Sequence, residues 1–231
     1  MDNFHKLIEG FHNFKQTYFL KERQYFESLE KAQNPKTLVV ACCDSRVDPA
    51  ILLHCKPGDL FVIRNVAALV PAVTQASNPC SVMSAIEYGV KHLNVEHIVV
   101  MGHSHCGGIH GLMAPETIAG ETYIQDWVGI ASPALERLQA ITGDEDEKTR
   151  SRHCEEGAVL ISLDNLLSYP WIAERVKNGQ LKLHALYYDL SEGNLYRFSP
   201  DSEDFELLFH TIENPKLALQ KPGEVALVFR F

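Results

Sequence analysis

The chain has 231 residues, of which 45% are hydrophobic, and a formal net charge of -9 at pH 7. This length suits one α/β domain with a large core, and no linker or repeat divides the sequence. The negative charge and the lack of Lys/Arg clusters argue against a nucleic-acid or anionic-membrane partner. No run reaches the length of a membrane span, and the N-terminus lacks a signal peptide's apolar segment. We therefore expect a cytoplasmic protein that handles a small molecule.

The first half of the chain predicts a helical arm followed by buried strands. Apolar and aromatic residues recur at helical spacing in the first thirty residues, at Phe4, Leu7, Ile8, Phe11, Phe14 and Tyr18. Short runs rich in β-branched residues follow at 37–41, 60–63 and 97–101. Because the runs at 37–41 and 97–101 do not alternate with polar residues, they are typical of parallel strands that are buried on both faces. The run at 60–63 is predicted to be a third short strand, introduced by the turn signal at 56–59. A helix is expected over about 81–93.

The second half predicts further helices and strands. A helix is expected over about 154–168, after a solvated acidic loop at 143–148. Alternation over 181–188 and around 195–198 predicts a hairpin that turns at Glu192-Gly193-Asn194. The last residues, 225–231, are predicted to form a strand, and an apolar strand at a chain end invites pairing in an oligomer.

Together these elements predict an α/β fold with a mainly parallel central sheet flanked by helices, an N-terminal helical arm and C-terminal strands. We expect a single domain over 1–231. Within it, the arm occupies 1–32, the α/β core 33–200 and a C-terminal strand extension 201–231.

Two polar stretches each begin where a predicted parallel strand ends, one at 42–46 and the other at 103–108. In open α/β sheets, ligands gather beyond the carboxyl ends of the strands, so we expect the two stretches to converge. Thiolates of Cys42 and Cys106 with the imidazole of His103 form a donor set that zinc selects. Three protein ligands leave one tetrahedral position open, which is typical of a catalytic zinc site.

Other cysteines and histidines compete for these roles. Cys43 is adjacent to Cys42, but consecutive strand residues point to opposite faces, so only one of them is expected to face the crevice. His105 is either a surface imidazole or a proton-transfer group. We interpret the remaining cysteines as ordinary buried or half-buried thiols, namely Cys55, Cys80 and Cys154.

The Cys-x-Asp-Ser-Arg motif at 42–46, followed by Arg64-Asn65-Val66-Ala67 and by His-x-x-Cys-Gly-Gly at 103–108, resembles the β-class carbonic anhydrases, especially their plant-like branch. The match extends from about Gln33 to Phe198 and includes 86–88, 153–155 and 166–170. This resemblance implies one Zn²⁺ per subunit and the reversible hydration of carbon dioxide to bicarbonate and a proton, by attack of zinc-bound hydroxide.

The resemblance also implies the roles of individual residues. It assigns zinc to Cys42, His103 and Cys106, and so chooses Cys42 over Cys43. It makes Asp44 and Arg46 the catalytic carboxylate-guanidinium pair beside the metal. The implied substrate-binding residues are Gln33, Phe61, Val66, Tyr88 and Gly107. They line the carbon dioxide pocket partly across a subunit interface, so a homodimer or higher homo-oligomer is expected. Apolar side chains suit carbon dioxide, and the Gln33 amide suits a developing oxyanion.

Position 39 departs from a regulated branch of the same family. Some bacterial members carry a tryptophan three residues before the first cysteine ligand, where it forms an inhibitory bicarbonate site with an arginine and a tyrosine. Val39 occupies that position here, although Arg64 and Tyr188 are present. The sequence therefore predicts the unregulated type.

Three other functions remain as alternatives. A carbonyl sulfide or carbon disulfide hydrolase would use the same zinc chemistry and would release sulfide. In a non-catalytic zinc-binding protein, Asp44 would close the fourth zinc position. A thiol redox enzyme is disfavoured, because the sequence contains no Cys-x-x-Cys pair.

Overall fold

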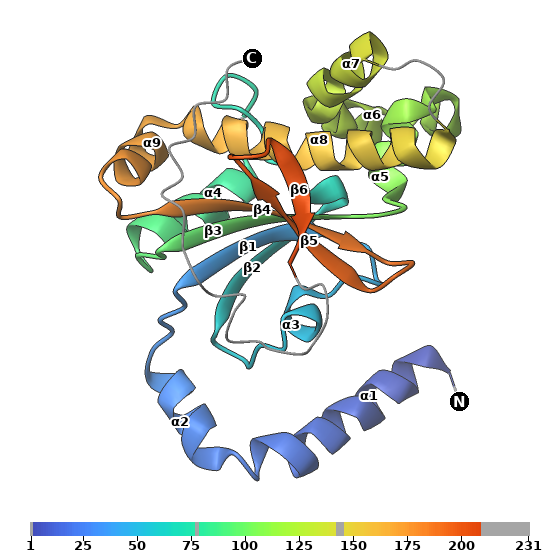
Figure 1. The fold of residues 1–231 in the computed structure, drawn as a ribbon. Coiled ribbons are helices and arrows are strands. Elements are labelled where there is room, and N and C mark those ends of the chain that lie inside the picture. Colours follow the sequence, from blue (N-terminus) through green and yellow to red (C-terminus); the bar gives the residue numbers. More distant parts are fainter. Residues whose placement is uncertain (1, 77–78, 142–145, 209–231) are drawn as a thin grey trace. The chain divides into compact units, whose positions relative to one another are not determined.

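The computed structural model describes residues 2–76, 79–141 and 146–208, and it divides into the units Met1–Asn34 and Pro35–Phe231. The N-terminal unit consists of α1 (Asn3–Phe14), a π-helical turn (Lys15–Phe19) and α2 (Arg23–Lys31) (Figure 1). The Asp2 side chain caps α1 by accepting a hydrogen bond from the backbone N of His5. The predicted apolar face of α1 is present and exposed, at Phe4, Leu7, Ile8 and Phe11.

In its described residues, the second unit is built on a six-stranded sheet, in the order β2-β1-β3-β4-β5-β6 (Figure 1). The parallel strands are β1 (Thr37–Cys42), β2 (Leu60–Asn65), β3 (His97–His103) and β4 (Lys182–Asp189). Two antiparallel strands extend the sheet, β5 (Asn194–Ser199) and β6 (Asp204–Leu207). The predicted hairpin is confirmed as β4 and β5, and the predicted α/β fold with a mainly parallel sheet is confirmed as well.

Seven helices are described around this sheet, and the sequence predicted only two of them. They are α3 (Pro49–Leu52), α4 (Ser81–Lys91), α5 (Gly107–Met113), α6 (Thr122–Val128), α7 (Ser132–Ile141), α8 (Glu147–Leu167) and α9 (Pro170–Lys177). Short 3₁₀ turns lie at Val66–Ala68, Pro115–Ile118 and Gly129–Ala131. No helix in the described ranges is long and apolar enough to cross a membrane.

The start of α8 corrects the sequence prediction. The helix begins at Glu147, whereas the sequence predicts a loop through residue 148 and a helix only from about Cys154. Asp146 caps α8, because its side chain accepts a hydrogen bond from the backbone N of Thr149. Acidic residues are favourable at a helix N-terminus, so part of the acidic stretch begins the helix. Residues 143–145 and the predicted strand over 225–231 lie outside the described residues.

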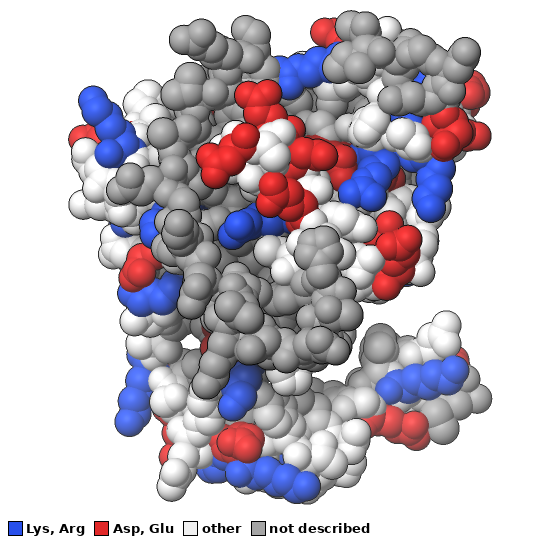
Figure 2. All heavy atoms as spheres, in the orientation of Figure 1, with Lys and Arg blue, Asp and Glu red and all other residues white. Residues whose placement is uncertain are grey.

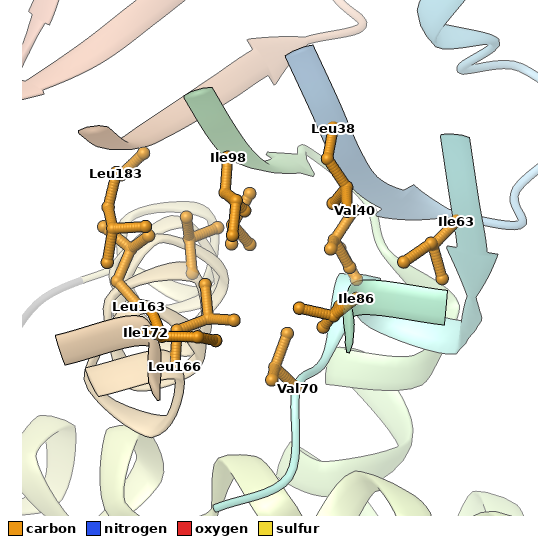
Figure 3. Close-up of a cluster of buried hydrophobic side chains, with 14 of the residues drawn as sticks. Leu38, Val40, Ile63, Val70, Ile86, Ile98, Leu163, Leu166, Ile172 and Leu183 are labelled. Atoms are coloured by element: carbon orange, nitrogen blue, oxygen red, sulfur yellow. The ribbon is translucent and has the colours of Figure 1, made fainter. Parts of the chain in front are cut away.

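The main core lies between one face of the sheet and helices α4, α8 and α9 (Figure 3). Strand residues Leu38 and Ile98 meet helix residues Ile86 and Leu163 there. The other face of β1 and β3 carries a smaller buried cluster of Val39, Ala41, Val99 and Met101. Burial on both faces explains why the sequences of these strands do not alternate with polar residues.

Charge is unevenly distributed on the surface. On the face drawn in Figure 2, acidic side chains gather in the upper part of the molecule and basic side chains are scattered around them. These acidic side chains contribute to the formal net charge of -9.

Candidate active site

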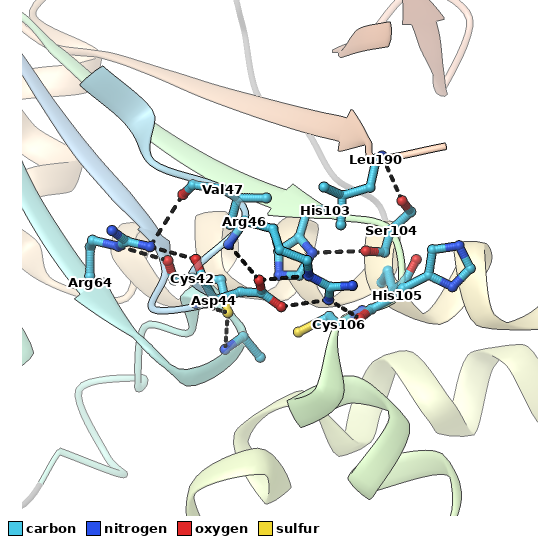
Figure 4. Close-up of polar contacts among 12 residues, drawn as sticks. Cys42, Asp44, Arg46, Val47, Arg64, His103, Ser104, His105, Cys106 and Leu190 are labelled. Carbon is cyan, nitrogen blue, oxygen red and sulfur yellow. Dashed lines mark hydrogen bonds and ion pairs between the residues drawn. The ribbon is translucent and has the colours of Figure 1, made fainter. Parts of the chain in front are cut away.

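Three potential metal ligands converge at the carboxyl ends of β1 and β3. Cys42 ends β1, His103 ends β3, and Cys106 precedes the first residue of α5. Ala41 pairs with Met101 in the sheet, so the ends of the two strands are neighbours. The ligand atoms of the three residues all lie within 4.8 Å of one another, and each residue is at most 4% exposed (Figure 4).

The imidazole of His103 is oriented to bind a metal. Its Nδ1 lies 2.8 Å from the backbone O of Ser104, which can only accept a hydrogen bond, so Nδ1 carries the proton. The lone pair of Nε2 is therefore free for a metal. In the described part of the chain, this buried Nε2 has no hydrogen-bond partner. A buried polar atom without a partner is costly, and metal coordination removes that cost.

The two thiols share one hydrogen-bonded arrangement. The Cys106 thiol donates to the Cys42 sulfur, which lowers the pKa of Cys42 and raises that of Cys106. Cys42 Sγ also accepts the backbone N–H groups of Asp44, at 3.4 Å, and Ala67, at 3.3 Å. Because two adjacent thiolates repel each other, a bound cation is needed to deprotonate both. Two thiols and an unpaired imidazole nitrogen thus fit zinc.

Asp44 and Arg46 form a two-bond ion pair beside the cluster (Figure 4). Arg46 Nε donates to Asp44 Oδ1 at 2.9 Å, and Arg46 Nη2 donates to Asp44 Oδ2 at 2.7 Å. These bonds hold the pKa of Asp44 well below its usual range. Arg46 Nη2 also donates to the backbone O of His105 at 3.1 Å, so the pair joins the two motif loops.

Arg64 has a structural role that the sequence pattern does not predict. It lies on β2 and donates to the backbone O of Cys42 at 3.0 Å and that of Asp44 at 2.6 Å. Further contacts reach the backbone O of Val47, at 3.3 Å, and the carboxylate of Asp48, at 3.2 Å. The guanidinium therefore holds the whole loop after β1. The motif Arg64-Asn65-Val66-Ala67 was the sequence feature that could have pointed to a role for Arg64. The motif does not reveal which groups the guanidinium binds.

Two of the predicted substrate-binding residues lie beside the ligands. Val66 precedes Ala67, whose N–H binds Cys42 Sγ. The turn containing Val66 also packs closely on α5, because a Cβ added to Gly108 would lie 2.6 Å from Val66 Cγ1. Gly107 directly follows Cys106 and begins α5.

Phe61 and Tyr88, two further predicted substrate-binding residues, lie away from the cluster within their own unit. Phe61 and Tyr88 pack on each other, with ring centroids 6.1 Å apart, and Tyr88 is 45% exposed. Phe61 pairs with Leu38, whereas Asn65 pairs with Cys42, so Phe61 lies about 13 Å along the strands from the ligands. Gln33 belongs to the N-terminal unit and is exposed.

The residues that could compete for the ligand and proton-transfer roles, and the position that marks the regulated branch, differ in exposure. Cys43 is exposed and Val39 is completely buried. His105 is exposed, and its Nε2 lies 3.3 Å from Ser191 Oγ. It lines a cavity of about 550 Å³ that also reaches Cys106 and Tyr187.

Known proteins resemble this chain in sequence. A family model described as "Carbonic anhydrase" matches residues 37–195. Beta carbonic anhydrase 5, chloroplastic, of Arabidopsis thaliana is 38% identical over 201 residues, which cover 87% of this chain and 66% of that protein. Beta carbonic anhydrase 3 of the same plant is 40% identical over 196 residues, covering 84% of this chain and 76% of that protein.

Solved structures resemble the chain in fold. The β-carbonic anhydrase CcaA matches with a TM-score of 0.85 and 31% identity, over 89% of this chain and 100% of that one. One of two tetrameric β-carbonic anhydrases of Sordaria macrospora matches with a TM-score of 0.74 and 29% identity, over 86% of this chain and 98% of that one.

Proposed function

The chain belongs to the β-carbonic anhydrases, and from this premise we propose that it catalyses the reversible hydration of carbon dioxide to bicarbonate and a proton. The proposal is carried by the buried cluster of Cys42, His103 and Cys106, with its unpaired Nε2. These three residues would hold one zinc ion per subunit. Zinc supplies a Lewis acid that lowers the pKa of water and so provides a nucleophile near neutral pH.

Asp44 and Arg46 are proposed to act on that nucleophile. Because Arg46 fixes both oxygens of Asp44, the carboxylate has a defined orientation and stays ionised. Asp44 would accept a hydrogen bond from the nucleophile and so direct its lone pair towards carbon dioxide. The engagement of Asp44 with Arg46 supports a catalytic site over a non-catalytic one, which would need this carboxylate on the metal.

The carbon dioxide pocket is proposed to be completed by a second copy of the chain. Val66 and the Gly107 backbone would contact the substrate from the subunit that holds the zinc. Phe61 and Tyr88, at the other end of the strands, would reach it from the partner, and the Gln33 amide would donate to the developing oxyanion. The exposure of Tyr88 supports this arrangement, and the active unit is then a homodimer or a larger homo-oligomer.

Regulation and location also remain proposals. Val39 is a buried strand residue, and Arg64 is bonded to its own chain, which supports an enzyme that bicarbonate does not shut down. A cytoplasmic location is likewise proposed. Beta carbonic anhydrase 5 of Arabidopsis thaliana is named as chloroplastic and beta carbonic anhydrase 6 of the same plant as mitochondrial, and these locations are those of the two relatives.

Zinc analysis combined with proton release on rapid mixing with carbon dioxide tests the proposed function. We expect about one zinc per chain, as a three-ligand catalytic site implies, and rapid acidification. Full zinc occupancy without turnover would overturn the enzymatic assignment. Faster release of sulfide from carbonyl sulfide would favour the alternative hydrolase.

A further inference from the structure

A buried carboxylate, Glu155 of α8, lies directly behind one of the metal ligands. Its Oε1 accepts a hydrogen bond from the backbone N of Cys106 at 3.0 Å. Its Oε2 accepts a second from the hydroxyl of Tyr187 at 2.7 Å. Glu155 is 5% exposed and Tyr187 is 1% exposed, so water does not compete freely for these bonds. Both carboxylate oxygens are therefore hydrogen-bonded to groups inside the protein.

The backbone that Glu155 binds follows an unusual path. His105, between the ligands His103 and Cys106, has φ of 58°, in the left-handed region that residues other than glycine rarely adopt. External contacts must hold such a turn. Arg46 does so at the backbone O of His105, and Glu155 does so at the backbone N of Cys106. The direction in which Cys106 presents its sulfur depends on this turn.

The packing of α8 fixes Glu155 in place. A Cβ added to Gly102 on β3 would lie 2.5 Å from Val159 Cγ2 and 3.7 Å from the backbone O of Glu155. The helix thus contacts β3 one residue before the ligand His103. Tyr187, on β4, holds the second carboxylate oxygen, so the side chain cannot rotate away from Cys106 without losing that bond.

We propose that Glu155 is a positioning residue for the metal centre, which holds the Cys106 backbone so that its sulfur faces Cys42 and His103. Tyr187 in turn orients Glu155. This inference rests on the proposed zinc site. Partners in the second coordination shell set ligand orientation, and their loss typically costs about 10–100-fold in metal affinity.

The neighbouring residue provides a matched control. Glu156 is also buried on α8, but its Oε1 accepts from Arg152 Nε at 2.8 Å. Glu155→Ala, Glu155→Gln and Glu156→Ala are compared in the full chain. The zinc Kd is measured by competition with a chromogenic chelator, and the visible spectrum is recorded after cobalt substitution. Unfolding curves establish that each variant is folded under the conditions of the assay.

We expect Glu155→Ala to raise the zinc Kd by about 10–100-fold and to shift the cobalt bands. Glu155→Gln keeps an oxygen for the Cys106 N–H, so it should retain most of the affinity. Glu156→Ala should bind metal as the parent does. If Glu155→Ala does not fold, Tyr187→Phe is used, and it should raise the zinc Kd and shift the cobalt bands in the same direction by a smaller amount.

The inference is overturned if the folded Glu155→Ala variant, or Tyr187→Phe in its place, has the zinc Kd and the cobalt spectrum of the parent. The proposed function would not be affected by that result. Equal zinc loss in Glu156→Ala would also overturn the inference. The lower zinc affinity would then result from a general destabilisation of α8 and not from the loss of the Glu155 hydrogen bonds. A parent protein that binds no zinc would instead overturn the proposed function, and this inference with it.

Discussion

At the scale of single residues, two adjacent cysteines have opposite surroundings. Cys42 is buried, and its sulfur accepts the N–H groups of Asp44 and Ala67. Cys43 is exposed. We predict that Cys42→Ala loses zinc and activity, because two remaining ligands cannot hold a stable tetrahedral site. Cys43→Ser should keep most of both. Elemental analysis and a carbon dioxide hydration assay measure the two effects, and equal zinc loss in the two variants would contradict the ligand assignment.

Arg64 should be replaceable neither by alanine nor by lysine. The guanidinium binds the backbone O of both Cys42 and Asp44, and its planar fork spaces these bonds. A lysine ammonium is a point charge that cannot reproduce this geometry. We predict that Arg64→Lys lowers kcat nearly as much as Arg64→Ala while zinc remains bound, because Asp44 and Arg46 lose their alignment. Hydration kinetics with parallel zinc analysis check this. Full activity of Arg64→Lys would contradict it.

At the scale of secondary-structure elements, the contact between α8 and β3 requires glycine at 102. A Cβ there would lie 2.5 Å from Val159 Cγ2, well inside van der Waals contact. We predict that Gly102→Ala lowers the free energy of unfolding by about 1–3 kcal/mol through overpacking. Denaturant unfolding measures the loss.

The double variant Gly102→Ala/Val159→Ala supplies the control for that prediction. It removes the methyl group that clashes, so it should be more stable than the sum of the two single effects predicts. Simple additivity of the two losses would show that the close contact is not the cause.

The pairing of β3 with β4 half-buries His184, a histidine that resists protonation. His184 Nε2 lies 3.0 Å from His97 Nδ1, and burial lowers the pKa of His184 to about 4. The unfolded chain, with a histidine pKa of about 6.5, binds the proton more readily. The free energy of unfolding should therefore fall as the pH drops from about 6.5 to about 4, by at most about 3 kcal/mol from this residue.

Replacement of His184 by glutamine tests this pH dependence. His184→Gln should show a shallower loss of stability between about pH 6.5 and pH 4 than the parent, in denaturant unfolding at several pH values. Loss of zinc in acid affects both proteins, so their difference isolates the histidine. His110→Gln, the same replacement at an exposed histidine, is measured alongside as the control. Equal slopes in His184→Gln and the parent would contradict the assignment.

At the scale of the whole molecule, the N-terminal unit is predicted to support assembly. Phe4, Leu7, Ile8 and Phe11 expose an apolar face on α1, and such faces are normally covered. We predict that deletion of residues 2–32 lowers the molecular mass measured by light scattering. Activity should fall in parallel while zinc stays bound, because the ligands lie outside the deleted segment. A strictly monomeric, fully active truncation would contradict the proposed shared pocket.

The local sequence was sufficient to predict elements that a simple pattern of apolar and polar residues marks. The β-branched runs predicted β1 and β3, because strands buried on both faces need no polar alternation. The short apolar run after a turn signal predicted β2, which is only partly buried. Polar motifs directly after two of these strands indicated where ligands meet. The resemblance then assigned Cys42, His103 and Cys106, and the tertiary structure brings their ligand atoms together.

Tertiary structure alone decided the elements and contacts that depend on distant residues. Helix α5 has the sequence GGIHGLM, which shows no clear helical periodicity, and it packs on the turn containing Val66. Arg64 and Glu155 act through backbone groups of Cys42 and Cys106. A sequence pattern reveals side-chain type and spacing, but it does not specify which backbone groups the fold places within hydrogen-bonding distance.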